Sequence, residues 1–140
     1  MMRRGLLVIS TFLLLATGCS STSQNYTYET AIQNGDIVSE GTTTGNLDKF
    51  YKFLADIESH QPSDVKITRY TKEGDPIFSN LKFDGEKIEV FEDSSKDKFG
   101  GGKRTFQCLS IEQQEKADEI AYYLAGCDNS SQRSMLTIKK

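Results

Sequence analysis

The chain is most constrained by an alternating segment, residues 77–92, that is interrupted at its centre by Asp84-Gly85. Apolar residues recur at every second position on both sides of this dipeptide, which is the pattern of half-buried β-strands. Asp-Gly is favoured in two-residue hairpin loops, because both central positions of a type I′ turn require a positive φ. We therefore predict a β-hairpin over residues 77–92. The expected cross-strand pairs are Phe83 with Glu86, Leu81 with Ile88, and Phe78 with Phe91.

A different spacing predicts one main helix over residues 46–59. Apolar side chains recur there at intervals of three and four, which places them on one helical face. They are Leu47, Phe50, Leu54 and Ile57, with Tyr51 beside them. We expect this stripe to pack in the core, with a ligand pocket as the alternative, and we expect Asn46 to cap the helix N-terminus.

Shorter patterns complete the prediction of the fold. They indicate a helix near residues 28–34 and strands near residues 36–38, 65–68, 105–109, 122–124 and 135–138, whereas Gly41 to Gly45 is typical of a loop. Ser110 and Gln113 form a capping-box pattern that favours a helix, but we expect a strand, a polar connection and a returning strand, and residues 111–120 stay open between helix and loop. The prediction is a single small α+β domain. An antiparallel sheet of about five to six strands, with the central hairpin 77–92, packs against the main helix 46–59.

The first 18 residues are predicted to be a lipoprotein signal peptide and not part of the fold. Arg3 and Arg4 precede an apolar run, and small residues follow before Cys19, which is the order of a secretory signal. The run Ala16-Thr17-Gly18-Cys19 is similar to a bacterial lipobox, although Ala16 stands where leucine is usual. The cysteine of that motif is acylated, so we expect a protein that is lipid-anchored at Cys19 on the extracytoplasmic face of the cell membrane. A plain cleaved signal is the alternative.

Removal of the signal peptide leaves 122 residues, of which about a third are apolar. This is enough for one hydrophobic core and too little for two. We expect residues 19–25 to be the lipidated cysteine with a short polar spacer, and residues 26–140 to be the domain. The net charge falls from −3 to −5, which argues against nucleic acid as a partner because such binding depends on Lys and Arg.

Two cysteines remain if Cys19 carries lipid. An exported chain meets an oxidising compartment, so a disulfide between Cys108 and Cys127 is the first expectation. Free thiols, or a redox or metal pair, are the alternatives. The chain has no CxxC motif and a single histidine, His60, which is few ligands for a metal cluster.

Five short segments occur in an order that is typical of one family. They are Gly35-Asp36-Ile37-Val38, Asn46-Leu47-Asp48-Lys49-Phe50, Glu73-Gly74-Asp75-Pro76-Ile77, Asp97-Lys98-Phe99-Gly100 and Tyr123-Leu124-Ala125-Gly126-Cys127. Over roughly residues 36–127 the chain resembles the small Bacillus-type lipoproteins that carry the uncharacterised domain DUF4362. The resemblance implies a lipoprotein address and a disulfide that ends at Cys127, and it implies no activity.

The longest loop signal, residues 93–103, is the candidate ligand-binding segment. Its candidate residues are Asp93, Asp97, Lys98, Gly100 and Gly101. The glycine run lacks the spacing of a phosphate-binding P-loop, and Asp93, Ser95 and Asp97 match only the start of a calcium loop. We expect no catalytic residue, no metal and no cofactor.

Two hypotheses for function follow from these features. The first is a non-catalytic binding module that is held at the membrane by its lipid and takes an envelope protein or a small ligand. The alternative is a cell-envelope hydrolase that uses paired carboxylates, with Asp75, Asp93 and Asp97 as candidates because they lie in loops. The sequence leaves the oligomeric state open.

Overall fold

The computed structural model describes residues 25–128 and 132–140. The predicted signal peptide, Cys19 and all of the spacer except Asn25 lie outside the described residues. The elements in chain order are α1 (Tyr28–Gln33), β1 (Ile37–Glu40), β2 (Thr43–Gly45), α2 (Leu47–Glu58), β3 (Ser63–Tyr70), β4 (Pro76–Phe83), β5 (Ile88–Asp93), β6 (Lys103–Cys108), β7 (Ser110–Glu115), β8 (Glu119–Ala125) and β9 (Arg133–Lys139).

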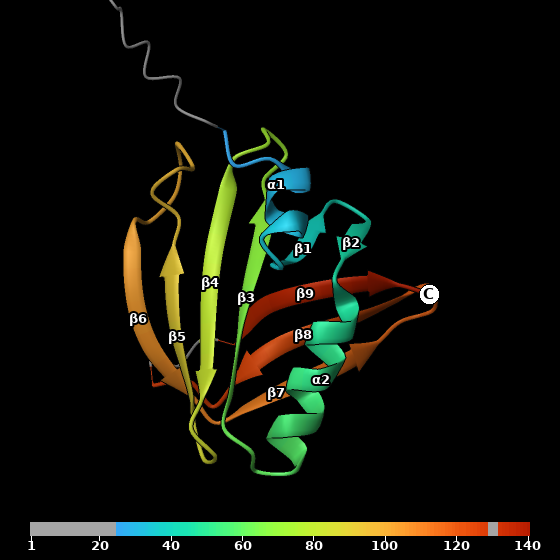
Figure 1. Cartoon of the computed structure of the whole chain (residues 1–140), viewed down its shortest axis with the longest axis vertical. Coiled ribbons are helices and arrows are strands. Elements are labelled where there is room, and N and C mark those ends of the chain that lie inside the picture. The colour runs from blue at the N-terminus through green and yellow to red at the C-terminus, as the bar shows by residue number, and fades with distance from the viewer. Residues whose placement is uncertain (1–24, 129–131) are drawn as a thin grey trace, which may run out of the picture.

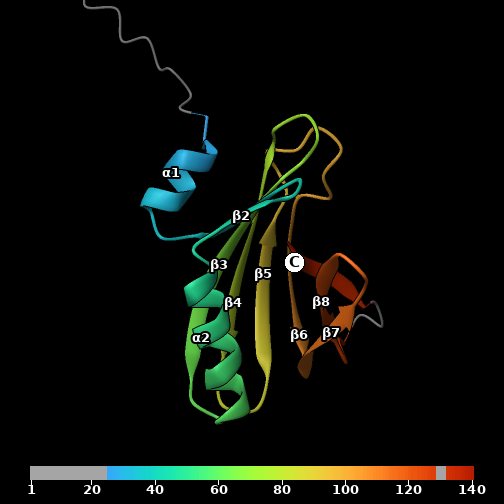
Figure 2. The same ribbon diagram turned by 90° about the vertical axis from the view of Figure 1, so that its right-hand side faces the viewer.

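These strands form two sheets that enclose one hydrophobic core (Figures 1 and 2). The larger sheet has the order β2-β1-β3-β4-β5-β6, and the smaller has the order β7-β8-β9. Figure 1 shows β7–β9 running nearly across the direction of β3–β6, as in orthogonal sheet packing. The helix α2 contributes the fully buried Phe50 and Phe53 to the same core, and the ring of Phe50 lies 4.8 Å from that of Tyr122 in β8.

The prediction of a single antiparallel sheet is wrong in two respects. β1 pairs in parallel with β3, with Ile37 opposite Ile67, because the chain crosses over through α2 between these strands. The last three strands form a second sheet and do not extend the first. Two facing sheets bury each other's apolar faces, whereas a single larger sheet would leave one such face exposed. The domain is therefore broadly α+β, but mostly β, with a mixed six-stranded sheet and two helices.

The hairpin β4–β5 is confirmed, but its loop is longer than predicted. Phe83 faces Ile88 and not Glu86, so residues 84–87 form a four-residue loop. Asp84 explains this, because its Oδ1 accepts hydrogen bonds of 2.8 Å from the backbone N–H groups of Glu86 and Lys87. In this loop Gly85 alone has a positive φ, whereas a type I′ turn needs two such residues. The register moves by two positions, so every side chain keeps its predicted face. The corrected pairs are Leu81 with Val90 and Phe78 with Asp93.

The main helix is confirmed within one residue at each end, but its predicted cap is wrong. Asn46 adopts a left-handed conformation with φ 54° and makes no capping hydrogen bond. Its side-chain amide donates to the carbonyl oxygens of Ile32 and Asp36, at 3.1 and 2.7 Å. Asn46 therefore joins α1, β1 and α2.

Two further segments differ from the sequence patterns. The run from Gly41 to Gly45, expected as a loop, contains β2, which pairs with β1. Residues 110–115 form a strand, because pairing with β8 outweighs the weak helical preference of the capping box. The tight turn that follows is closed by a hydrogen bond from Lys116 N–H to the Glu119 carbonyl, 2.9 Å long.

The predicted disulfide is present between Cys108 and Cys127, with an S–S distance of 2.07 Å. Cys108 ends β6 in the larger sheet, and Cys127 follows β8 in the smaller sheet. A hydrogen bond from Asp128 N–H to the Gln107 carbonyl, 3.0 Å long, lies beside it. The disulfide therefore fixes the junction between the two sheets.

Candidate functional site

The predicted loop between β5 and β6 is held together by its own hydrogen bonds. Ser94 donates to the carbonyl of Gly102 through both its N–H and its hydroxyl, at 2.9 and 3.0 Å. Two further backbone bonds, from Asp97 to Ser94 and from Gly100 to Asp97, close consecutive turns. The loop is consequently a compact structure with a defined shape.

The two candidate carboxylates of this loop already have partners. Asp93 accepts from the N–H and the hydroxyl of Ser95, at 3.0 and 2.6 Å, and these hydrogen bonds lower the pKa of Asp93. Asp97 accepts from the N–H of Phe99 at 2.9 Å. Both carboxylates therefore shape the loop, and their hydrogen bonds leave each of them less free to bind a ligand.

The other candidate residues of the loop differ in what surrounds them. A Cβ at Gly100 would collide with the carbonyl oxygen of Ser94, so this glycine permits a close backbone approach. Gly101 has open space around it. Lys98 is exposed, and its Nζ lies 5.7 Å from the centre of the Phe99 ring, which is itself 81% exposed. The structure therefore does not gather these residues around one ligand position.

A cleft of about 560 Å³ lies beside this loop, at the end of the molecule where the described chain begins. Lys96 of the loop forms part of its lining. Most of the lining comes from residues 25–29, which lead into α1, and from residues 73–76 at the turn between β3 and β4. Its aromatic residues are Tyr26, Tyr28, Tyr70 and Phe78, and its acidic residues are Glu29, Glu40, Glu73 and Asp75. The volume is within the range that is typical of small-molecule sites.

The position of Tyr26 in this cleft is fixed by a buried carboxylate. Asp36 is 3% exposed, and its Oδ2 accepts hydrogen bonds of 2.7 Å from the hydroxyls of Tyr26 and Thr68. The same oxygen lies 3.0 Å from Lys66 Nζ. Burial lowers the pKa of Lys66, but hydrogen bonds with Tyr26 and Asp36 outweigh burial, so the pKa is raised and Lys66 stays charged.

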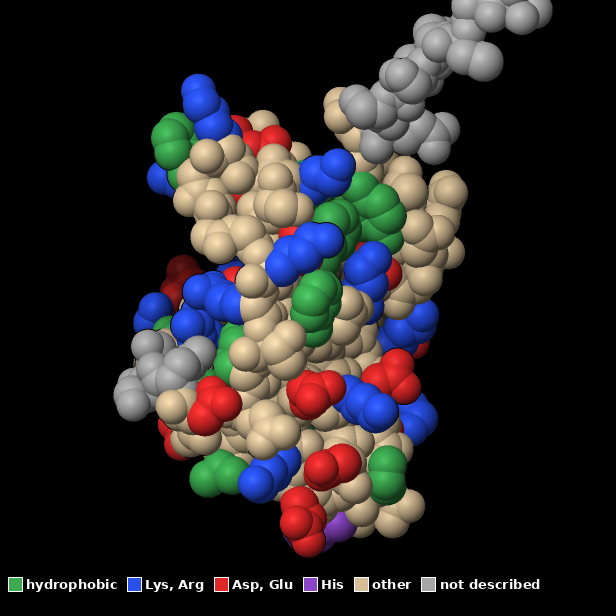
Figure 3. Space-filling model, turned by 90° about the vertical axis from the view of Figure 1, so that its left-hand side faces the viewer, with side chains coloured by type: hydrophobic (Ala, Val, Ile, Leu, Met, Phe, Trp, Pro, Cys, Tyr) green, Lys and Arg blue, Asp and Glu red, His purple; other side chains and the backbone are tan. Residues whose placement is uncertain are grey.

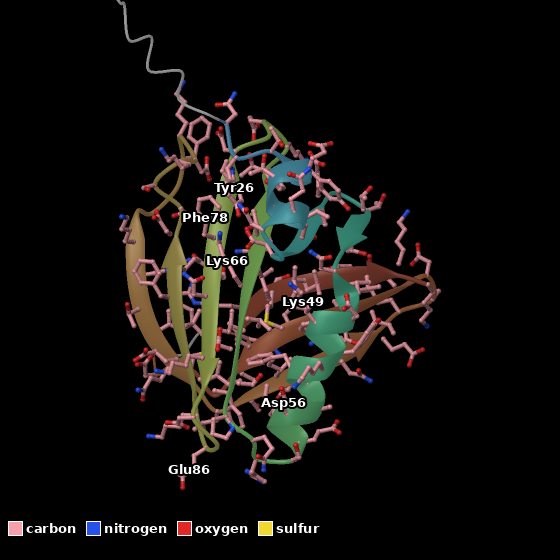
Figure 4. All side chains as sticks on the ribbon, in the orientation of Figure 1. Tyr26, Lys49, Asp56, Lys66, Phe78 and Glu86 are labelled. Atoms are coloured by element: carbon pink, nitrogen blue, oxygen red, sulfur yellow. A yellow bond between two sulfur atoms is a disulfide. The ribbon has the colours of Figure 1, made fainter. Side chains whose placement is uncertain are left out.

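The aromatic rings of Tyr26 and Phe78 already lie against one cation. The Lys66 ammonium lies 4.6 Å from the ring centre of Tyr26 and 4.8 Å from that of Phe78. The two rings meet edge to face with their centres 5.0 Å apart. Figure 4 shows the three residues together on the part of the sheet that α1 adjoins. Aromatic faces of this kind bind ammonium groups through their quadrupole.

The pKa of Tyr70 reflects the negative charge around the cleft. Its hydroxyl donates to the backbone carbonyl of Tyr26 at 2.8 Å. Burial raises the pKa of Tyr70 to about 12, and negative charge from neighbours that include Asp36, Glu40 and Glu29 contributes to the rise. The cleft therefore opposes the appearance of another negative charge.

The lining residues were only partly predictable from the sequence. Of the three acids proposed for a hydrolase, only Asp75 lines this cleft. Tyr26, Tyr70 and Glu40 were missed, because they are separated in sequence by up to 44 positions and meet only when β1 and β3 pair. A signal was present in β3, where Lys66, Thr68 and Tyr70 repeat a polar residue at every second position.

The described part of the chain meets the requirements of neither a metal site nor a membrane-spanning helix. Within residues 25–128 and 132–140, no group of three His, Cys, Asp or Glu side chains is arranged to hold a metal ion. In the same part of the chain, neither helix has the length and apolar character needed to cross a membrane.

Comparison with known proteins identifies one family. The model of the domain of unknown function DUF4362 matches residues 34–123. No curated protein and no solved structure matches the chain. The matched range includes β1, α2, β3 and the β3–β4 turn, and it therefore covers most of the elements that line the cleft.

Proposed function

Because this chain belongs to the DUF4362 family, whose function is unknown, we propose a role from its own residues: an extracytoplasmic, lipid-anchored binding module without catalytic activity. The observation that carries the proposal is the cleft beside α1, with its aromatic and acidic lining. We assign this cleft as the binding site.

The proposed anchor at Cys19 agrees with the position of the cleft. Six residues, 20–25, separate Cys19 from Tyr26, which itself lines the cleft. An extended chain spans roughly 3.5 Å per residue, so this spacer reaches about 20–25 Å. The anchor would then hold the cleft close to the membrane surface, with the β4–β5 loop at the far end of the molecule (Figure 1).

The composition of the lining favours a cationic ligand. Four carboxylates and one lysine, Lys96, line the cleft, so its charge is strongly negative. Tyr28 and Tyr70 add aromatic surface to the same lining. Carboxylates with aromatic rings suit an amine or a guanidinium, whose charge both groups attract. We therefore propose a ligand that carries ammonium or guanidinium groups, such as a polyamine or a basic peptide segment of an envelope protein.

The hydrolase alternative gains no comparable support. A paired-carboxylate mechanism needs one acid whose pKa is raised so that it can donate a proton. Asp93 has a lowered pKa because of its bonds with Ser95. Asp75 lines the cleft, whereas neither Asp93 nor Asp97 does.

Titration with cationic probes tests the proposed site. Spermidine and a tri-lysine peptide are added to the chain downstream of the signal peptide, carrying Cys19→Ser, and amide shifts are followed by NMR. We expect saturable shifts at the cleft and, in a Glu73→Gln/Asp75→Asn variant, an affinity about tenfold or more lower, because charged hydrogen bonds are lost.

The matched control removes two carboxylates elsewhere. Glu86→Gln/Glu89→Gln makes the same change in net charge with exposed residues of the β4–β5 hairpin, and Figure 4 places Glu86 at the end of the molecule opposite Tyr26. Equal loss of affinity in both variants would indicate non-specific charge attraction and contradict the assigned site.

A further inference from the structure

Three strands of the larger sheet carry charged residues on the face that is otherwise its hydrophobic core. On this inward face Arg69 follows Ile67 in β3, Glu92 follows Val90 in β5, and Arg104 precedes Phe106 in β6, each at a spacing of two. Side chains two apart in a strand share a face. The three charges therefore lie at one end of the space between the sheets.

These charges converge on one buried carboxylate. Glu92 is 7% exposed, and Arg104, its direct partner across the β5–β6 pair, is hydrogen-bonded to Oε1. Arg69 Nη2 lies 3.5 Å from Oε2 of the same carboxylate. Burial lowers the pKa of Arg69 and the neighbouring Arg104 lowers it further, while Glu92 opposes both effects.

A third arginine reaches the cluster because of an irregularity in β9. The register of β8 with β9 shifts between Tyr122 and Tyr123, which places Arg133 opposite Leu124, a buried residue. Without the shift, Arg133 and Leu136 would point to opposite faces, because they are three residues apart. The bulge therefore turns Arg133 inward, and bulges that redirect a side chain are common beside functional sites.

Arg133 joins Arg69, Glu92 and Arg104 in one cluster through neighbours on two sides. The Arg133 guanidinium lies 4.8 Å from the ring centre of Phe106, two residues from Arg104 in β6. On the other side, Arg69 Nη1 donates to the carbonyl of Ser134, the neighbour of Arg133, at 3.3 Å. Arg69 and Arg104 pair with Glu92, and Arg133 adds a third cation, so the four side chains together carry a surplus of two positive charges.

One donor of the cluster has no partner. Arg133 Nε is buried and makes no hydrogen bond within the described part of the chain. A buried, unpaired donor of a charged group costs more than an ordinary unmade hydrogen bond, so a partner is expected at such a position. The side chains of Arg69 and Arg104 keep 30% and 45% of their surface exposed, so a solute can reach the cluster.

A depression adjoins the cluster. A cavity of about 270 Å³ is lined by Arg69 together with residues 134–137 of β9. Figure 3, which views the β6 side, shows Lys and Arg side chains gathered next to an indentation of the surface. Of the four residues of the cluster, Arg69 lines this cavity and therefore connects it to the other charges.

We propose that the cluster of Arg69, Glu92, Arg104 and Arg133 is a binding site for a phosphate group, either inorganic phosphate or a phosphomonoester. Guanidinium groups present paired donors that match phosphate oxygens. The surplus of two positive charges equals the charge of a phosphate dianion. The site lies between the sheets, whereas Tyr26 and the proposed cationic cleft lie on the opposite face of the larger sheet. The two proposals can therefore fail independently.

The test measures phosphate binding by calorimetry and by NMR, on the chain downstream of the signal peptide carrying Cys19→Ser. We expect saturable binding of inorganic phosphate with one site per chain. Arg104→Gln and Arg133→Gln should each weaken it about tenfold or more, because each removes charged hydrogen bonds. The control Lys87→Gln, in the β4–β5 loop, should leave the affinity unchanged.

A variant that is expected to bind phosphate more tightly distinguishes a binding role of the cluster from a structural role. Glu92→Gln removes the anion that competes with phosphate, so we expect tighter phosphate binding, by about tenfold. Circular dichroism confirms that each variant is folded before its affinity is compared. A merely structural cluster would bind phosphate no better after this change.

A second arm identifies the source of the phosphate. Sedimentation with phosphatidic acid vesicles is compared with sedimentation with phosphatidylcholine vesicles, which lack the monoester. If the protein sediments with the phosphatidic acid vesicles and Arg133→Gln does not, the natural ligand is a lipid phosphate. If the protein sediments with neither kind of vesicle, the natural ligand is a soluble phosphate. Absence of saturable phosphate binding in the parent chain, or an affinity of the Arg104→Gln and Arg133→Gln variants equal to that of the parent chain, would overturn the proposal.

Discussion

At the scale of single residues, the carboxylate of Asp36 connects three parts of the structure through one oxygen atom. That oxygen accepts hydrogen bonds from Tyr26, ahead of α1, and from Thr68 in β3. It also pairs with Lys66. Asp36 directly precedes β1, so its loss would remove the bond that holds the N-terminal segment to the sheet.

Replacement of Asp36 tests this connection. Asp36→Ala leaves a lysine and two hydroxyls without their acceptor, and we expect it to lower the free energy of unfolding by about 2–4 kcal/mol. Asp64→Ala, at an exposed position of β3, is the matched control and should change stability by less than about 0.5 kcal/mol. Urea unfolding measures both, and equal effects would show that Asp36 has no special role.

Tyr70 predicts a pH dependence of stability. Its folded pKa is about 12 and its ordinary value is 10.0, so the folded state holds this proton more tightly than the unfolded state does. The resulting stabilisation is complete below pH 10 and is lost as the pH rises towards 12. Urea unfolding between these pH values should show a decline that Tyr70→Phe reduces. An identical decline in the variant would exclude Tyr70 as its source.

At the scale of elements, two adjacent residues of α2 face different environments, one the core and the other the solvent. Phe50 is fully buried, whereas Tyr51 is 48% exposed. Phe50→Ala should cost about 3–5 kcal/mol, because a cavity forms between the helix and β8. Tyr51→Ala should cost about 0.5 kcal/mol or less. Thermal unfolding of the two variants would contradict the packing of α2 if both lost equal stability.

The disulfide joins the two sheets, and its removal is the second test at this scale. It closes a loop with a sequence separation of 19, for which the chain-entropy model gives about 3 kcal/mol. Cys108→Ser/Cys127→Ser should lower stability by about this amount in urea unfolding. Reduction of the parent chain should have a similar effect, and unchanged stability after reduction would mean that the bond contributes little.

The sequence predicted local elements better than their pairing. The alternation of Leu81 and Phe83 indicates a strand with one buried face, because that pattern lies within one segment. The parallel pairing of β1 with β3 depends on a crossover through α2, and no local pattern records it. The hairpin loop was misjudged for a related reason, since the side chain of Asp84 completes hydrogen bonds that a turn signature does not count.

The candidate site was harder to predict than the strands. Residues of the 93–103 loop are close in sequence, so a loop signal could select them, and the structure uses its carboxylates for internal bonds. The cleft is assembled from segments that are distant in sequence, such as Tyr26 and Tyr70. The inward charges Arg69, Glu92 and Arg104 did leave a signal in the sequence. In each of three strands, a charged residue stands two positions from a buried apolar residue, where the alternation predicts another apolar residue.

At the scale of the whole molecule, the proposed position of the cleft at the membrane depends on attachment at Cys19. We predict that the protein partitions into the membrane fraction of its host and that Cys19→Ser releases it. Mass spectrometry of the N-terminal peptide should detect acylation of this cysteine. A soluble parent protein with an unmodified Cys19 would contradict the anchor and leave the binding proposals to be judged separately.

We propose that the cleft binds a cationic ligand while the protein is held at the membrane. A photo-crosslinking residue is placed at Lys72, next to the cleft residue Glu73, and in a second version at Glu86 on the opposite end. Both versions are irradiated in intact cells, with and without Cys19→Ser, and the products are identified by mass spectrometry. We expect one basic partner or amine ligand that is captured from position 72, is not captured from position 86, and is lost in the Cys19→Ser form. Equal products from both positions, or none from position 72, would contradict it.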